Sequence, residues 1–343
     1  MTPRVVTFGE IMLRLGSPGL ERLLQSATLT ATFGGGEANV AVSLAQFGLR
    51  SDYVTRLPNN ALGEAVIRAL RAEGVGTSHI ARGGSRLGIY FTETGASQRA
   101  STVLYDRAHS AISEIPPDAV DWDAVMSGAA WFHVTGITPA LGERTVEATK
   151  ASIAAAKKAG ATVSVDLNYR RKLWSEAQAQ AAMRPLMSAV DVVIANEEDL
   201  QSVLGVHMSD TDVTTGALNI DAYRDAAQWV THKLGPRLVA ITLRESLSAS
   251  DNGWSAVLWD GDTNTLHESQ RYAVRLVDRI GGGDSFAAGL IYALATGRSK
   301  DASLRFAVAA SALKHTIPGD FNRVTVAEVD ALAGGDASGR VQR

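Results

Sequence analysis

The sequence predicts an α/β fold in which helices cover both faces of a mainly parallel sheet. Strand-like and helix-like segments alternate over most of the 343 residues, as they do in proteins built from repeated strand–helix units. Several short runs are rich in apolar residues, which is typical of strands buried on both faces. Ala-rich stretches between these runs predict the covering helices, and the chain is long enough for a large core.

The predicted parallel strands follow one another along the middle of the chain. They are residues 131–135, 162–166, 190–195 and 238–243, and the clearest helices are 145–158 and 177–189. Ligands of such sheets bind at the carboxyl ends of the strands. Asp166, Asn196 and Asp284 each lie just past a strand-like run, so we expect functional groups at these positions.

Two segments depart from the strand–helix alternation. Residues 14–33 and 87–105 contain β-like stretches without intervening helices, and we expect them to form a small separate sheet. The predicted domain covers residues 1–330, with the small sheet drawn from about 11–33 and 86–107. Residues 331–343, which include Gly-Gly-Asp-Ala-Ser-Gly, are expected to form a flexible tail.

Composition excludes several classes of function. Lys and Arg number 33 against 36 Asp and Glu, and a net charge of −3 gives no electrostatic case for nucleic acid. No apolar run is long enough to span a bilayer, and the first residues lack the apolar core of a signal peptide. Cys is absent, which excludes disulfides and thiolate chemistry. We expect a cytoplasmic protein without a membrane partner.

The stretch from Asp278 to Gly289 says most about chemistry. A strand-like run ends at Asp278, and Gly281, Gly282 and Gly283 precede a helical pattern. Consecutive glycines let backbone N–H groups approach a ligand, and a helix N-terminus adds free donors and partial positive charge. Asp284 places a carboxylate inside this anion hole, as phosphoryl transfer to an alcohol requires. The alternative is an ordinary turn followed by an acidic first helical turn.

Residues 278–286, Asp-Arg-Ile-Gly-Gly-Gly-Asp-Ser-Phe, closely resemble the signature Asp-Thr-x-Gly-Ala-Gly-Asp-x-Phe of the ribokinase-like (PfkB) carbohydrate kinases. Arg279 replaces Thr and Gly282 replaces Ala, but neither change removes a carboxylate or a backbone donor. The resemblance extends over nearly the whole chain. It implies a ribokinase-like three-layer sandwich, with the small sheet as a lid over the sugar, and it implies ATP and Mg²⁺ as cofactors.

A second glycine cluster, Gly34-Gly35-Gly36, opens a helix that continues through Phe47. Alone it is also compatible with a tight loop capped by Glu37. A dinucleotide-binding fingerprint is a weaker alternative, because Asn39 stands where the third glycine belongs. The arrangement resembles the sugar-contacting loop of ribokinase-like enzymes, which implies that Gly35, Gly36 and Asn39 contact the sugar.

A third motif, Asp166-Leu-Asn168-Tyr-Arg170, follows a predicted strand. Arg presents a planar fork that binds a carboxylate or phosphate through two hydrogen bonds. Together with Tyr90 and Tyr105-Asp-Arg107, this motif resembles one branch of the family, the 2-keto-3-deoxygluconate kinases. The resemblance implies that Arg107 and Arg170 grip the acid group of a sugar acid. The full set of implied substrate contacts is Gly35, Gly36, Asn39, Tyr90, Tyr105, Arg107, Asn168, Arg170, Asp278 and Asp284.

The run Asn196-Glu-Glu-Asp199 resembles the family's Asn-x-x-Glu element, which orders Mg²⁺ and phosphates, partly through water. Whether Glu198 or Asp199 organises Mg²⁺ stays open, because this ion keeps several waters and takes few protein ligands. The sequence has no G-x-x-x-x-G-K-[ST], so an ordinary P-loop is excluded. The implied ATP contacts are Asn196, Thr242, Arg244, Ser246, Gly281 and Gly283.

We therefore expect an ATP-dependent kinase that phosphorylates the terminal hydroxyl of 2-keto-3-deoxygluconate to give 2-keto-3-deoxy-6-phosphogluconate. Asp284 is the expected general base, and Gly281–Gly283 form the anion hole. The alternatives are a kinase of a neutral sugar such as fructose or ribose, a nicotinamide-dependent oxidoreductase, and a sugar-acid-binding protein without turnover. Preference between gluco and galacto epimers and activation by a monovalent cation stay open. Unpaired strand edges in the small sheet predict a homo-oligomer that pairs through them.

Overall fold

A mainly parallel sheet forms the centre of the molecule in a computed structural model that describes residues 2–206, 220–336 and 338–339. Its strand order is β14-β13-β12-β11-β10-β9-β1-β4, and β15 also pairs with β13. Pairing is parallel from β4 to β12 and antiparallel at the β13, β14 and β15 end. The strands are β1 (Arg4–Phe8), β4 (Arg50–Val54), β9 (Trp131–Thr135), β10 (Thr162–Asp166), β11 (Val192–Ala195), β12 (Leu238–Ser246), β13 (Asp251–Asp260), β14 (Thr265–Glu268) and β15 (Tyr272–Arg275).

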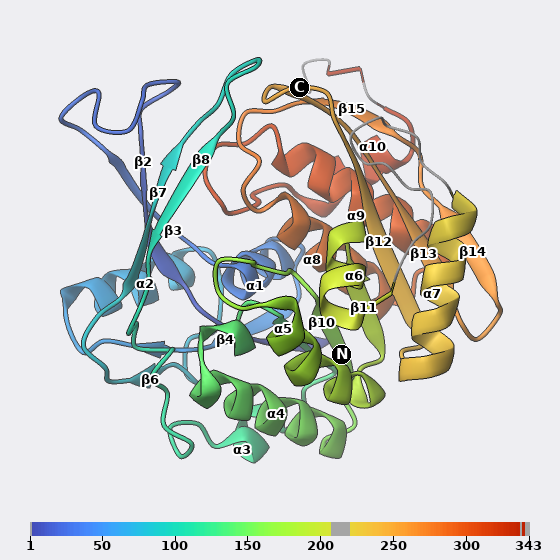
Figure 1. Ribbon diagram of the computed structural model, residues 1–343, viewed down its shortest axis with the longest axis horizontal. Helices are drawn as coiled ribbons and strands as arrows, with labels where there is room; N and C mark the ends of the chain where they lie inside the picture. Colours follow the sequence, from blue (N-terminus) through green and yellow to red (C-terminus); the bar gives the residue numbers. More distant parts are fainter. Residues whose placement is uncertain (1, 207–219, 337, 340–343) are drawn as a thin grey trace.

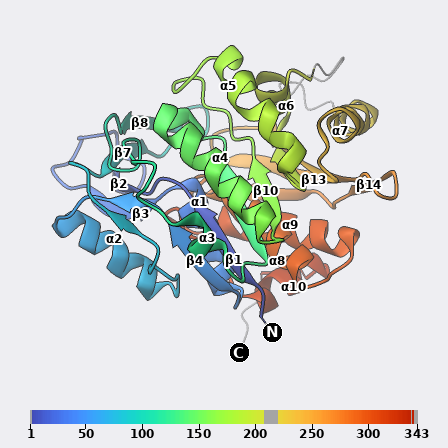
Figure 2. The same cartoon turned by 90° about the horizontal axis from the view of Figure 1, so that it is seen from below.

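Helices cover both faces of this sheet, which makes three layers (Figures 1 and 2). One apolar core lies between the sheet and α3 to α7, and a second lies between the sheet and α1, α8, α9 and α10. The helices are α1 (Gly36–Gln46), α2 (Ala61–Ala72), α3 (Trp122–Met126), α4 (Glu143–Lys158), α5 (Glu176–Met183), α6 (Glu197–Leu204), α7 (Ile220–Leu234), α8 (Gly282–Ala295), α9 (Lys300–Lys314) and α10 (Val326–Ala333), with 3-10 turns at Pro139–Leu141 and Arg184–Ala189.

The predicted strands 131–135 and 162–166 match β9 and β10, whereas β11 begins two residues later than predicted and β12 extends further. The predicted helix 177–189 is wrong in its second half, because the chain changes to a 3-10 helix at Arg184. Pro185 causes this change, since its ring removes a backbone donor and clashes with the preceding turn of an α-helix. His133 lies buried on β9, where Nδ1 contacts the Ser164 hydroxyl at 2.8 Å.

A second sheet projects from one side of the molecule (Figure 1). Its strand order is β3-β2-β7-β8, and it is built from the two segments that the sequence predicts to form a small sheet. An apolar cluster that includes Ile11, Leu87 and Phe321 joins its base to α1 and α2. The strands are β2 (Met12–Gly16), β3 (Thr30–Gly34), β7 (Gly88–Glu93) and β8 (Thr102–Asp106), and the short strands β5 (Arg56–Leu57) and β6 (Ala81–Arg82) pair separately.

The C-terminal region is more regular than predicted. Helix α10 continues to Ala333, and a capping box between Thr325 and Glu328 fixes its start. Residues 337 and 340–343 of the predicted tail lie outside the described residues. Within the described part of the chain, no helix has the length and apolar character that a membrane span needs.

Candidate active site

The two glycine clusters meet at one place, although they lie far apart in the sequence. Asn39 on α1 donates from Nδ2 to Oδ2 of Asp284 on α8 at 2.7 Å, across 245 residues. The Cβ position of Gly36 lies 3.6 Å from Oδ1 of the same carboxylate. The N-termini of α1 and α8 therefore converge on Asp284, at the edge where the parallel strands end.

The loop before α8 has the features of an anion hole. Gly281 has a φ of 83°, and a Cβ there would overlap the carbonyl oxygen of Asp320. A Cβ on Gly282 would overlap the ring of His315. Gly283 is exposed, and no described atom lies within 4 Å of its Cβ position. Because the first N–H groups of a helix have no partner within it, the open side at Gly283 offers donors to a phosphate.

Asp284 combines partial exposure with a shifted pKa. Burial raises the pKa of its carboxyl to about 6, while the hydrogen bond from Asn39 opposes that rise. The charge of Asp320 also raises this pKa, and the charges of Arg170 and Lys314 lower it. A carboxylate with a pKa near 6 is ionised at neutral pH and remains basic enough to accept a proton from a hydroxyl.

The Asp166–Arg170 motif lies beside Asp284. Oδ1 of Asp166 accepts the N–H of Asn168 at 3.1 Å, and Asn168 has a positive φ of 38°. Burial raises the pKa of Asp166 well above its usual range, and the charges of Asp199 and Asp284 add to this rise. Arg170 is exposed, and its charge lowers the pKa of Asp166, Asp199 and Asp284. Nη1 of Arg170 donates to the Tyr169 carbonyl at 2.9 Å, and no ion pair joins Arg170 to these acids among the described residues, so its guanidinium can turn to a ligand.

The predicted residues of the second sheet come together, but two of them have protein partners. Tyr90 and Tyr105 stack with their centroids 6.0 Å apart, and Arg107 lies over the Tyr105 ring. Tyr90 donates to Oδ2 of Asp320 at 2.6 Å. Arg107 is buried and donates through Nε to Oε2 of Glu10 at 2.7 Å. Tyr105 is the exposed member of the group.

Of the acids at the start of α6, Glu198 and Asp199 have other roles in this structure. Asp199 forms a capping box with Asn196 and accepts the N–H of Tyr169 at 2.8 Å. Glu198 is exposed and pairs with Arg171. Glu197, which the sequence analysis did not select, is only 8% exposed, and neither of its carboxylate oxygens has a hydrogen-bond partner among the described residues. Burial raises the pKa of Glu197, and the charge of Arg244 lowers it.

The predicted nucleotide contacts on β12 share one face of the strand. Thr242, Arg244 and Ser246 alternate with Leu243, which is buried, and Glu245, which is half-buried, and the Thr242 hydroxyl donates to the Ala195 carbonyl at 3.4 Å. Arg279 approaches from the loop before the anion hole. Burial lowers the pKa of Arg279, and the charge of Arg244 lowers it further. Nε of Arg279 is buried and has no hydrogen-bond partner in the described part of the chain. Two arginines close together beside an anion hole attract a polyanion.

Comparison with known proteins identifies the family of this chain. Residues 2–323 match the model of the pfkB family carbohydrate kinases. The chain belongs to this PfkB family. A solved structure of 2-dehydro-3-deoxygluconokinase from Thermotoga maritima is 50% identical, with a TM-score of 0.93 over 97% of this chain and 100% of the other. The 2-dehydro-3-deoxygalactonokinase of Haloferax volcanii is 35% identical over 98% of this chain and 99% of its own.

These matches confirm the predicted ribokinase-like fold and the predicted class of enzyme, a carbohydrate kinase. A putative Ribokinase II from E. coli, in complex with ATP and Mg²⁺, is 18% identical with a TM-score of 0.78, which shows a shared fold alone. As a PfkB kinase, the protein presents the signature Asp284 and its glycines at the N-terminus of α8. The substitutions Arg279 and Gly282 leave this arrangement intact.

The residues of this PfkB kinase suit a nucleotide and Mg²⁺. The open side of Gly283 and the two arginines suit phosphates, and Glu197 offers a carboxylate without a hydrogen-bond partner in the described chain. No group of three or more His, Cys, Asp or Glu residues that could hold a metal occurs in the described residues. Mg²⁺ bound mainly by phosphates and water needs no such group.

Sequence reasoning missed three buried groups that shape the site. Glu37 is not a helix cap, because its Oε1 accepts from the Thr135 N–H at 2.9 Å and from the Thr138 hydroxyl at 2.6 Å. Burial raises the pKa of Glu37 to about 7. Arg14 and Asp320 link the second sheet to the loop after α9. Their partners lie too far away in the sequence for any local pattern to reveal them.

Proposed function

We propose that the protein transfers the γ-phosphoryl group of ATP to the terminal hydroxyl of 2-keto-3-deoxygluconate, also named 2-dehydro-3-deoxygluconate, to form the 6-phosphate. The observation that carries this proposal is the pairing of Asp284 with an open anion hole in a chain that is 50% identical to a 2-dehydro-3-deoxygluconokinase. The positive charge of Arg170, which lowers the pKa of that carboxyl, supports an acidic substrate.

Asp284 acts as the general base in this proposal. Asn39 holds Oδ2, which leaves Oδ1 beside Gly36 to accept the proton of the attacking hydroxyl. The hydroxyl oxygen then attacks the γ-phosphorus, and the bond from phosphorus to the bridging oxygen of ADP breaks. Backbone N–H groups of Gly281 to Asp284 stabilise the charge on the transferring group.

Several residues hold the nucleotide in the same proposal. Asn196, Thr242, Arg244 and Ser246 lie along its path, and Arg279 contacts its phosphates. ATP and Mg²⁺ are proposed because the chain belongs to a family of carbohydrate kinases, and the E. coli neighbour that shares the fold was solved with both. Mg²⁺ neutralises phosphate charge when it is bound. We assign its protein contact to Glu197 before Glu198 or Asp199, because only Glu197 has both oxygens without a hydrogen-bond partner in the described chain.

The acid group of the substrate is assigned first to Arg170. Arg107 directs Nε and Nη2 to Glu10, so Nη1 remains for a ligand when the described residues are counted. In the same proposal, Tyr105, Asn168, Gly35 and Gly36 form hydrogen bonds with sugar hydroxyls. The named relatives include a gluconokinase and a galactonokinase, so both epimers are candidate substrates.

The test is ATP turnover with Mg²⁺ against 2-keto-3-deoxygluconate, its galacto epimer, fructose and ribose, with Asp284→Ala as the control. Turnover confined to the keto-deoxy acids and lost in the variant is the expected result. Preference for a neutral sugar would keep the kinase activity and refute the role of the arginines. No turnover on any substrate would favour a sugar-acid-binding protein.

A homo-oligomer through the second sheet is part of the proposal. Strand β8 is an edge strand, and Leu104 and Tyr105 on it are 51% and 41% exposed. Unpaired edges of this kind pair readily across a twofold axis. A monomer in light scattering at micromolar concentration would contradict it. Location in the cytoplasm stays a prediction from the sequence.

A further inference from the structure

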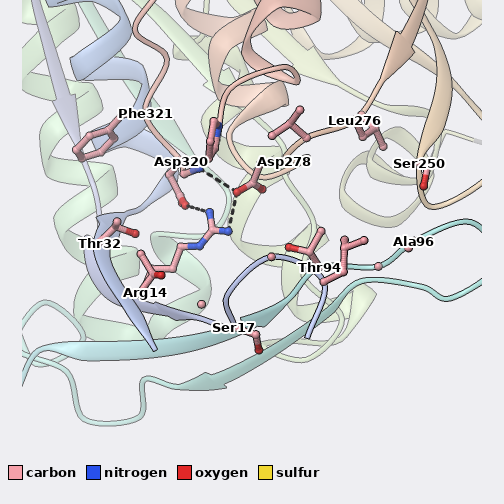
Figure 3. Close-up of a pocket in the computed structure, with 18 of the residues that line it drawn as sticks. Arg14, Ser17, Thr32, Thr94, Ala96, Ser250, Leu276, Asp278, Asp320 and Phe321 are labelled. Carbon is pink, nitrogen blue, oxygen red and sulfur yellow. Dashed lines mark hydrogen bonds and ion pairs between the residues drawn. The ribbon is translucent and has the colours of Figure 1, made fainter. Parts of the chain in front are cut away.

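Arg14 connects the second sheet to the main domain. It lies on β2, is 7% exposed, and donates through Nε to the Thr92 hydroxyl of β7 at 3.2 Å. The other two guanidinium nitrogens, Nη1 and Nη2, bind residues outside the second sheet. Nη2 pairs with Asp278 at 2.6 Å and Nη1 pairs with Asp320 at 2.7 Å, across 264 and 306 residues (Figure 3). One planar fork therefore joins two strands of the second sheet to two carboxylates of the main domain.

Asp278 and Asp320 also contact the backbone that leads into the anion hole, Asp278 through its carboxylate and Asp320 through its main-chain carbonyl. Asp278 accepts the N–H of Ile280 at 3.1 Å through Oδ1 and the N–H of Gly319 at 3.0 Å through Oδ2. The carbonyl oxygen of Asp320 lies so close to Gly281 that a Cβ there would overlap it. Because Gly281 is the N-cap of α8, a shift of the Asp278 carboxylate or of the Asp320 backbone would move the donors of the hole.

The charges make Arg14 difficult to replace. Burial raises the pKa of Asp320, the charge of Asp278 raises it further, and Arg14 lowers it. Two acids held close together in a buried place need a cation between them. Lys314 is also near, but its Nζ donates to the Ile317 carbonyl at 3.2 Å, and no ion pair joins it to either acid among the described residues.

A second contact shows that the sheet reaches the main domain beyond Arg14. Near the tip of the β7–β8 hairpin, the Ser97 carbonyl accepts the N–H of Ala249 at 2.8 Å, and the Ser97 N–H donates to the Ser250 hydroxyl at 2.9 Å. The sheet is therefore docked at its base and at its tip, and Arg14 lies between them. A cavity of about 990 Å³ beside Arg14, Asp278 and Asp320 gives solvent access to this pair of acids.

We propose that Arg14 is a positioning residue that couples the docked second sheet to the geometry of the anion hole. When the sheet is docked, the guanidinium holds Asp278 and Asp320, and these hold Ile280 and Gly281. When the sheet leaves, both acids lose their cation and the donors of the hole lose their alignment. Phosphoryl transfer is therefore fast only when the second sheet is docked over the substrate. Because docking also excludes water, transfer of the phosphoryl group to water is disfavoured. This inference rests on the proposed kinase function.

The test separates kcat from KM in Arg14→Ala, Arg14→Lys and Asp320→Asn. Misplacing catalytic donors by about 1 Å costs about 10²-fold, so Arg14→Ala should lose about that factor in kcat. Affinity for a non-hydrolysable ATP analogue should stay unchanged. Arg14→Lys should recover only part of the loss, because an ammonium lacks the planar fork. A residue that only anchors the sheet would raise KM for the sugar acid and leave kcat unchanged.

Arg99→Ala is the matched control. Arg99 pairs with Glu93 and with the Leu20 carbonyl, and both partners belong to the second sheet and its loops. Its loss should disturb the sheet without reaching the anion hole, so kcat should be retained. Thermal melting of every variant checks folding. If Arg14→Ala does not fold, the two single variants Arg14→Lys and Asp320→Asn are used to test the inference.

Chemical rescue measures whether an added cation restores the kcat of Arg14→Ala, which is not expected if Arg14 has a purely structural role. Guanidinium ion added at millimolar concentration should enter the cavity and restore part of the kcat of Arg14→Ala, and methylammonium should restore less. Unchanged kcat in every variant, or the absence of rescue in a folded Arg14→Ala protein, would overturn the inference. Absence of activity in the wild-type protein in the same assay would instead contradict the proposed function.

Discussion

The amide of Asn39 and the carboxylate of Asp284 are joined by a hydrogen bond of 2.7 Å between the first turns of two helices. This contact fixes one oxygen of the acid and leaves the other beside Gly36. Both helix N-termini carry partial positive charge, which stabilises the ionised carboxylate and any phosphate bound next to it. A single pair of side chains thus brings together the two glycine clusters and the candidate general base.

The first prediction concerns Asp284 itself. Asp284→Asn keeps the shape of the side chain and removes its basicity, so turnover should fall at least ~10²-fold. Folding should be nearly unchanged, because the amide can still pair with Asn39. Kinetics and thermal melting of the variant check both statements. Asp301→Asn, which alters an acid in the first turn of α9, is the control and should retain turnover. Near-normal activity in Asp284→Asn would show that Asp284 is not the general base.

The pH dependence of kcat/KM follows from the same carboxylate. Its pKa is raised to about 6, and only the ionised form accepts a proton. The rate should therefore fall about tenfold per pH unit below about 6 and level off above it. Asn39 stabilises the charged form, so Asn39→Ala should move the midpoint to higher pH, whatever it does to the maximal rate. A midpoint that moves to lower pH would contradict this role.

Arg170 offers a test of substrate class. A charge-assisted hydrogen bond contributes about 1.5–3 kcal/mol, so Arg170→Gln should raise KM for the keto-deoxy acid about ten- to hundredfold. Neutral sugars should not show this loss, because they have no carboxylate to pair. The neighbouring Arg171→Gln is the control, since Arg171 is exposed and pairs with Glu198. Equal effects of the two substitutions on KM would show that Arg170 does not bind the acid group.

The sequence predicts most of the fold and the centre of the site because these depend on local patterns. The strands β9 and β10 are short runs rich in Val and aromatic residues, and the glycines before Asp284 are adjacent. The features that the sequence does not reveal depend on contacts between residues that are distant along the chain. Arg107 is predicted to face the substrate, yet Glu10, 97 residues away, holds it. Glu197 looks like an ordinary acid at a helix start, and only its burial without a partner in the described chain distinguishes it.

Arg279 carries the last prediction, since it stands where the family signature has Thr. Its buried Nε has no hydrogen-bond partner in the described chain, and Arg244 is the nearby charge that lowers its pKa. If both arginines bind phosphates, Arg279→Gln should raise KM for ATP about tenfold, since losing one such contact costs about 1.4 kcal/mol or more. Arg275→Gln is the control, because Arg275 pairs with Asp251 in solvent. Unchanged KM and kcat in Arg279→Gln, with normal melting, would show that this arginine does not contact the nucleotide.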